Sequence, residues 1–87
     1  MKVSMKVDYG VRALIDLAQH FGEGPVQTSE IAARQGVPEP YLDQLLTTLR
    51  KAGLIKSRRG PQGGHVLAKD PIEMGLGTVF NILEGSM

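Results

Sequence analysis

Apolar residues recur at helical spacing over residues 5 to 20. Ser4 stands before this stretch as a predicted N-cap, and a loop of residues 22–25, rich in glycine, ends it. The apolar positions share one helical face, which predicts a first helix at the centre of the core. They are Val7, Val11, Leu14, Ile15 and Ala18, with Ala13, Leu17 and Phe21 widening the face.

A second, shorter helix is predicted over residues 29–35. Thr28 is the expected N-cap, and Gly36 is the expected left-handed stop. Ile31 and Ala32 are its predicted core contacts. The two residues before the cap, Val26 and Gln27, are expected to form a very short strand.

The third stretch has the clearest pattern. Its leucines fall at i, i+3, i+4 and i+7, which predicts a helix over residues 39–52 with one buried face. Pro38 or Pro40 fits its first turn, where a missing N–H costs nothing. Two helices joined by a short turn with a glycine form a helix-turn-helix. The leucines are Leu42, Leu45, Leu46 and Leu49; the opposite face carries Glu39, Asp43, Gln44, Thr47, Thr48 and Lys51.

A hairpin, or wing, is predicted over residues 54–68. Strands at residues 54–57 and 65–67 flank a loop whose glycines allow the positive φ angles of a hairpin tip. Residues 71–75 are expected to be an irregular turn, and a last helix is expected over residues 76–84. The predicted fold is therefore mainly α with a small β-hairpin, a single winged helix-turn-helix domain spanning residues 1–87.

Composition narrows the possible functions. The 87 residues suffice for one domain and include no cysteine, which excludes disulfides and cysteine-ligated metals in this chain. No apolar run is long enough to cross a bilayer, and the first residues have no apolar core like that of a secretory signal. We therefore expect no membrane partner and a cytoplasmic protein.

Charge is distributed unevenly along the chain. Residues 44–69 carry six basic side chains and no acidic one, whereas the remainder carries four basic and nine acidic side chains. One basic surface on a mildly acidic body fits a polyanion such as double-stranded DNA. The layout of a helix followed by a basic, glycine-rich hairpin points the same way, because the helix can enter a major groove.

Candidate DNA contacts fall into three groups. Short polar side chains on the third helix can meet base edges, the basic side chains and wing loop can meet phosphates or the minor groove, and the start of the second helix can hold a phosphate. Tyr41 fits a phosphate contact and a half-buried spacer equally well. The base-edge set is Asp43, Gln44, Thr47 and Thr48; the others are Lys51, Lys56, Arg58, Arg59, Gly60, Gln62, Gly63, Thr28 and Ser29.

A role without DNA binding also remains open for each group of candidate DNA contacts. A polar helix face can simply be solvated, the wing arginines can serve solubility, and Thr28 and Ser29 can be caps alone. A winged helix can also be a protein-interaction module that binds no nucleic acid, and retention on heparin or DNA resin would separate the two. His20 and His65 stand alone and are predicted to be ordinary loop or surface residues. No catalytic motif is present, so an enzyme is not expected.

Several short strings in order give a more specific indication. They are VDYGVRAL at 7–14, IA at 31–32, YLDQL at 41–45, LRKAGLI at 49–55, RGPQGG at 59–64 and ILEG at 82–85. Together they resemble the Rrf-two (Rrf2) family of bacterial transcription regulators, the IscR, NsrR and CymR type. The resemblance implies a winged-helix homodimer that binds a partly palindromic operator, usually as a repressor. It also implies DNA reading by Tyr41, Asp43, Gln44 and Thr47, with Arg59 beside the minor groove.

The chain departs from that family in two respects. Members usually continue past the position of Gly85 into a long dimerisation helix and, where they bind an iron–sulfur cluster, three cysteines. This chain stops at Met87 and has no cysteine. We therefore expect the DNA-binding part alone, with no cofactor in this chain and a weakened homodimer.

Overall fold

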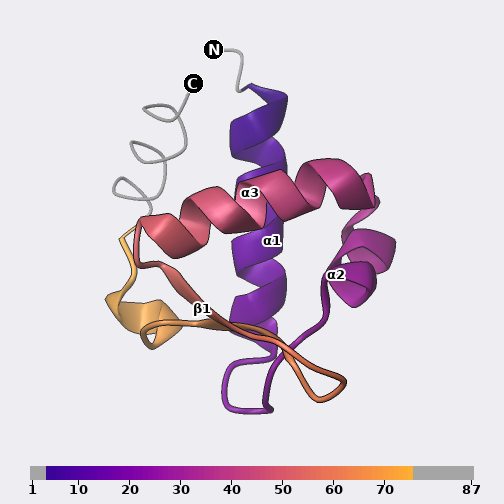
Figure 1. The fold of residues 1–87 in the computed structure, drawn as a ribbon. Helices are drawn as coiled ribbons and strands as arrows, with labels where there is room; N and C mark the ends of the chain where they lie inside the picture. Colours follow the sequence, from indigo (N-terminus) through magenta and orange to yellow (C-terminus); the bar gives the residue numbers. More distant parts are fainter. Residues whose placement is uncertain (1–3, 76–87) are drawn as a thin grey trace.

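The computed structural model describes residues 4–75, which form three helices followed by a two-stranded hairpin (Figure 1). The predicted fold class is confirmed. The predicted helix over residues 76–84 lies outside the described residues. The elements are α1 (Met5–Gln19), α2 (Thr28–Gln35), α3 (Glu39–Lys51), β1 (Ile55–Arg58), β2 (Gly64–Leu67) and the short 3₁₀ helix η1 (Pro71–Glu73).

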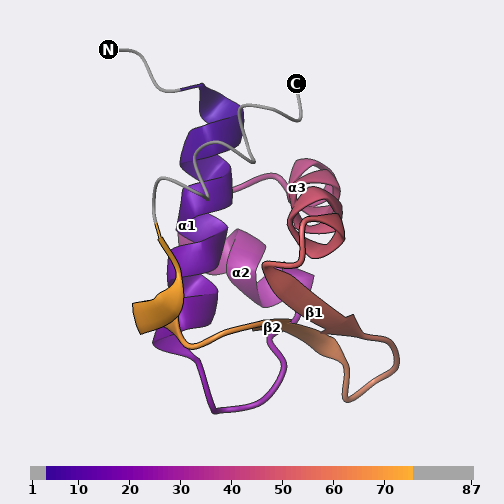
Figure 2. The ribbon, with the colours of Figure 1, turned by 90° about the vertical axis from the view of Figure 1, so that its left-hand side faces the viewer.

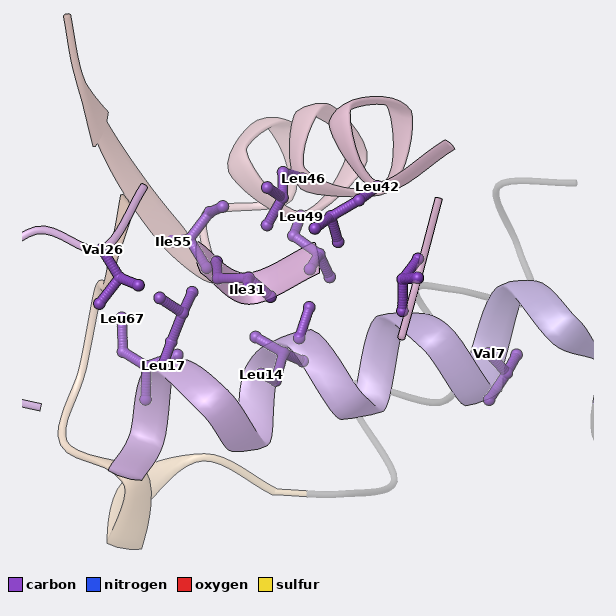
Figure 3. Packing of buried hydrophobic residues seen from close by; sticks show 12 residues of the cluster. Val7, Leu14, Leu17, Val26, Ile31, Leu42, Leu46, Leu49, Ile55 and Leu67 are labelled. Carbon is purple, nitrogen blue, oxygen red and sulfur yellow. The ribbon is translucent and has the colours of Figure 1, made fainter. Parts of the chain in front are cut away.

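The core lies where α3 crosses α1. Leucines of α3 face Leu14 and Leu17 of α1, and Ile31 of α2 enters between them (Figure 3). Leu42, Leu49 and Ile31 are completely buried, as the leucine spacing predicts. Burying each such side chain contributes about 1.5–3 kcal/mol. The helix-turn-helix is thus held by apolar packing against the first helix.

Helix ends follow the local sequence signals with one exception. Ser4 Oγ accepts the N–H of Val7 at 3.2 Å, which confirms the predicted cap of α1. Gly36 ends α2 with φ of 65°, in the left-handed region as predicted. The exception is Thr28, whose predicted capping role is wrong. It is the first residue of α2, Gln27 occupies the N-cap position, and no side chain caps that helix.

Three other sequence expectations need correction. Ile15 and Phe21 were expected on the buried face of the first helix but are 48% and 43% exposed. Ile15 lies beside the buried stripe of Leu14 and Leu17, and Phe21 lies beyond the end of α1 at Gln19. Helices α1 and α3 each end one residue earlier than predicted. Residues 71–73 form η1 and not an irregular turn, because Asp70 Oδ1 accepts the N–H of Ile72 at 3.0 Å.

The hairpin is antiparallel, with Ile55 opposite Leu67 at its base and Arg58 opposite Gly64 near its tip. The first strand is shifted one residue later than predicted, and the second begins one residue earlier than predicted. The base is anchored by the buried Ile55 and Leu67. The expected short strand before α2 is confirmed as one bridge, in which Val26 pairs with His65 through two main-chain hydrogen bonds of 2.9 and 2.8 Å.

A buried carboxylate ties α2 to α1. Asp16 has no exposed surface, and its oxygens accept two hydrogen bonds from Arg34, at 2.9 and 2.8 Å, and one from Gln35 at 3.0 Å. His20 Nδ1 lies 3.7 Å from the same carboxylate. The hydrogen bonds from Arg34 lower the pKa of Asp16, so this carboxylate is ionised at neutral pH.

Candidate nucleic-acid interface

Helix α3 and the hairpin lie on the side of the molecule away from α1 (Figure 2). The leucines of α3 point into the core, so its other face is left for solvent. Asp43, Gln44 and Lys51 are exposed on it, and Thr47 and Thr48 are partly exposed. The predicted polar face of the third helix is therefore accessible.

The two threonines direct their hydroxyl protons inward. Thr47 Oγ1 donates to the carbonyl of Asp43 at 2.9 Å, and Thr48 Oγ1 donates to the carbonyl of Gln44 at 3.2 Å. Each hydroxyl then has only lone pairs left for an outside partner. This geometry favours the two hydroxyls as acceptors of hydrogen bonds from an outside partner.

Tyr41 packs near the start of α3. Its ring makes an edge-to-face contact with Tyr9 of α1, with ring centroids 5.7 Å apart and planes at 74°. Arg12 lies 5.9 Å from the Tyr9 ring centroid. This packing supports the spacer role for Tyr41, and the side chain stays partly exposed. Its contact with a phosphate remains a prediction.

The wing loop is shaped by glycines. The N–H of Gly63 donates to the carbonyl of Gly60 at 2.9 Å, which closes a tight turn over Pro61 and Gln62. A Cβ at Gly63 would overlap the carbonyl oxygen of Arg58, so only glycine fits there. Gly63 is buried by the hairpin itself, whereas Gly60 and Gln62 are exposed.

The basic side chains of this surface have no acidic partners within residues 4–75. The ion pairs of that part of the chain involve Arg12, His20 and Arg34, which belong to α1, its C-terminal cap and α2. The exposed set without an ion pair there is Arg50, Lys51, Lys56, Arg58, Arg59 and Lys69. Their charge is available to an anionic partner.

The start of α2 meets the hairpin. Gln27 Nε2 donates to the carbonyl of Pro61 at 3.3 Å, and Thr28 Oγ1 lies 2.8 Å from His65 Nε2. Ser29 is exposed beside them. The predicted phosphate-binding residues at this helix start are thus next to the wing, although the hydroxyl of Thr28 is engaged by His65.

His65 was predicted to be an ordinary loop or surface residue, whereas the structure places it in the strand β2 with two side-chain contacts. Its ring is half-buried, and its two nitrogens lie 2.8 Å from Thr28 Oγ1 and 2.7 Å from Ser57 Oγ. Burial lowers the pKa of His65, so the imidazole is neutral at pH 7. The partner Thr28 is far away in sequence, so no local pattern could have indicated this contact.

The donor atoms present do not fit a metal or cluster site. The chain has no cysteine, and residues 4–75 contain no group of three or more histidine and acidic side chains that could hold a metal ion. Within the same residues, no helix is long and apolar enough to span a membrane.

Comparison with known proteins identifies the family. Residues 3–87 match the profile of the Rrf2 family, described as iron-dependent transcriptional regulators. The chain belongs to the Rrf2 family. It is 44% identical over 87 residues to the HTH-type transcriptional regulator IscR of Serratia proteamaculans, matching 100% of this chain and 53% of that protein. The resemblance inferred from the short strings is confirmed, and the relatives that the chain matches are named as transcriptional regulators.

Solved Rrf2 structures share the fold. T. potens IscR has 59% sequence identity and a TM-score of 0.92, matching 100% of this chain and 64% of that chain. CymR (YrzC), the global cysteine regulator of B. subtilis, has 44% identity and a TM-score of 0.93, matching 98% of this chain and 66% of that chain. The chain therefore spans roughly half to two thirds of the length of these relatives.

Proposed function

We propose that this chain is the DNA-binding part of an Rrf2 transcriptional regulator, and that it reads operator DNA with α3 and the wing. One observation carries the proposal most directly: α3 and the hairpin lie on the same side of the fold (Figure 2). The polar residues of α3 are at least partly exposed, and the exposed basic residues of the hairpin form no ion pair within residues 4–75. That arrangement suits a helix in the major groove with a hairpin on the neighbouring backbone. The family to which the chain belongs supports it.

The proposal divides the labour between two sets of residues. Lys51, Lys56, Arg58 and Arg59 supply affinity that depends little on sequence, because they meet phosphates or the minor groove. Asp43, Gln44, Thr47 and Thr48 supply specificity by meeting base edges. Tyr41, Thr28 and Ser29 add phosphate contacts, and the loop of Gly60, Gln62 and Gly63 lets the wing approach the backbone closely.

The proposal includes a homodimer on a partly palindromic operator, acting as a repressor in the bacterial cytoplasm. A two-fold protein matches a two-fold site, and two half-sites roughly double the number of phosphates contacted. Sedimentation of the chain alone and with an operator duplex tests the dimer. A 1:1 complex at saturation would contradict it.

The first test is fluorescence anisotropy of a labelled random duplex titrated with the chain, at low salt and near physiological salt. We expect binding that weakens steeply with salt, because several phosphates release counterions. Absence of binding at low salt would contradict DNA binding by this chain and favour the protein-interaction alternative.

A matched pair of variants tests the division of labour. Arg59→Ala should weaken binding to all duplexes and lower the salt slope by about one. Gln44→Ala should relax the choice among duplexes and leave the slope unchanged. Equal effects of both substitutions on an operator and a random duplex would contradict the division.

A further inference from the structure

His65 joins the two parts of the fold that the proposed function uses. Its Nε2 lies 2.8 Å from Thr28 Oγ1 at the start of α2, and its Nδ1 lies 2.7 Å from Ser57 Oγ on β1. Its main chain pairs with Val26, just before α2. Figure 2 shows the segment that enters α2 passing beside the hairpin. One residue thus contacts the helix-turn-helix and both strands of the wing.

Few other contacts fix the outer half of the wing. The buried residues Ile55 and Leu67 anchor only its base, and residues 58–62 are exposed. Beyond the base, the other hydrogen bonds that join the wing to the rest of residues 4–75 are the two of the Val26 bridge and the 3.3 Å bond from Gln27 to Pro61. A two-stranded hairpin is marginally stable by itself, so its direction depends on such contacts.

The hydrogen-bonding capacity of these three groups is well matched. A neutral imidazole has one N–H and one lone pair, and each hydroxyl can donate or accept. Whichever ring nitrogen carries the proton, both hydrogen bonds can therefore form. No buried side-chain polar atom within residues 4–75 is left without a partner. The chain of contacts from Thr28 through His65 to Ser57 is therefore complete without any ligand.

We propose that His65 is a positioning residue for DNA recognition, which sets the wing at a fixed angle to the helix-turn-helix through Thr28. This role rests on the proposed function. His65 touches no DNA in this role; it keeps Arg58 and Arg59 where they meet a phosphate while α3 lies in the groove. Without the link the hairpin samples more directions, and the arginines lose part of their contribution to binding.

Three substitutions of His65 separate the contributions of its two side-chain hydrogen bonds to DNA binding. His65→Phe keeps the ring and removes both hydrogen bonds. His65→Gln keeps an amide within reach of Thr28, and His65→Asn keeps one within reach of Ser57. Because the Thr28 contact joins the wing to α2 and the Ser57 contact lies within the hairpin, Gln should rescue binding better than Asn. We expect Phe to weaken binding about 3- to 10-fold, the scale of one lost hydrogen bond.

A double-mutant cycle distinguishes positioning from a general loss of stability. His65→Phe and Arg59→Ala should be less than additive, because a wing without its arginine gains little from a fixed direction. His65→Phe and Gln44→Ala should be additive, because Gln44 lies on α3. Unfolding curves for each variant establish which fraction is folded at the assay temperature.

Thr28→Val removes the hydrogen bond between Thr28 and His65 from its other partner. Because the proposed function also gives Thr28 a phosphate contact, Thr28→Val should weaken binding at least as much as His65→Phe, and the two together should be less than additive. If Thr28 instead contacts DNA only by itself, its effect will add to that of His65→Phe.

Unchanged affinity in His65→Phe, alongside clear weakening in Arg59→Ala, would overturn the positioning role and leave the proposed function intact. Full additivity of His65→Phe with Arg59→Ala would overturn it as well. Absence of DNA binding by the unsubstituted chain would overturn the proposed function, and this role with it.

Discussion

The α1–α2 side and the α3–wing side of this domain use charge in opposite ways. On the α1–α2 side, the arginines pair with acidic residues of the same domain. Arg34 pairs with the buried Asp16 and lies 3.6 Å from Glu30, and Arg12 pairs with Asp8. On the second side, cations such as Arg58 and Arg59 have no acidic partner within residues 4–75. A small domain can thus separate the charges that stabilise it from those that it offers to a partner.

The largest effect should come from removing the buried carboxylate of the α1–α2 side. Asp16→Ala removes the acceptor of three side-chain hydrogen bonds and should lower the free energy of unfolding by about 3 kcal/mol. Urea unfolding at neutral pH measures it. The folded fraction should still bind DNA, because the side-chain partners of Asp16 are Arg34 and Gln35 of α2 and not residues of the wing.

Acid provides an independent check on Asp16. Its pKa is lowered from the ordinary 3.8, chiefly by the hydrogen bonds from Arg34. Its stabilisation is therefore complete above pH 3.8 and is lost as pH falls through the lower folded-state pKa. The stabilities of the unsubstituted chain and Asp16→Ala should converge at low pH. A constant difference across that range would contradict the ionised role.

A smaller effect, on DNA binding and not on stability, is expected from a substitution on the α3–wing side. Arg58→Ala removes an exposed cation without an ion pair in the described part of the chain, so the free energy of unfolding should barely change. DNA affinity at low salt should fall about tenfold, and the salt slope should fall by about one. Anisotropy titrations and urea unfolding, measured on the same sample, check the expected loss of affinity and the unchanged stability. A large loss of stability in Arg58→Ala would contradict the expectation that this charge does not stabilise the fold.

A still smaller effect should appear with pH at His65. Burial holds its folded-state pKa below the ordinary 6.5, so the unfolded chain takes up this proton first as pH falls. The free energy of unfolding should therefore decline below pH 6.5 until the folded-state pKa is reached. Asp43 and Arg50 act on the ring in opposite directions.

Subtracting the pH profile of His65→Phe isolates this contribution from the other titrating groups. The difference should flatten above pH 6.5. A decline of equal steepness in both proteins would contradict the assignment to His65.

The smallest effect is expected at Asp8, which also sits on α1 and also pairs with an arginine. Here both partners are 47% exposed, and the oxygen–nitrogen distance is 3.2 Å. Exposed pairs of this kind contribute about 0–1 kcal/mol. Asp8→Ala should therefore lower the free energy of unfolding far less than Asp16→Ala. Similar losses would mean that burial does not distinguish the two aspartates.

Local patterns predicted most of the fold. The leucine spacing of α3 and the glycine at Gly36 each act within one or two turns of chain, so the sequence alone indicates them. The same rules failed where the deciding neighbour is distant. Ile15 continues the apolar face of α1, yet how far α3 covers that face depends on the crossing of the two helices.

The same reason explains which tertiary contacts were missed. Asp16 and its partner Arg34 are 18 residues apart, and His65 and Thr28 are 37 apart. One signal was present for Asp16: it directly precedes Leu17 on the apolar side of the first helix, where a carboxylate requires a partner. Nothing near His65 in sequence marks it as more than a strand residue. The exposure of the basic and polar side chains, by contrast, could be predicted because charge patterning does not depend on long-range packing, and their contacts with DNA stay predictions.

The unpaired cations between residues 44 and 69 have a consequence for the free protein. Like charges repel one another, and dissolved salt screens the repulsion between exposed charges that lie more than a Debye length, about 8–10 Å, apart. Added salt should therefore relieve electrostatic strain in the unbound domain while it weakens the complex with DNA. The same six side chains make the free domain and the complex respond to ionic strength with opposite signs.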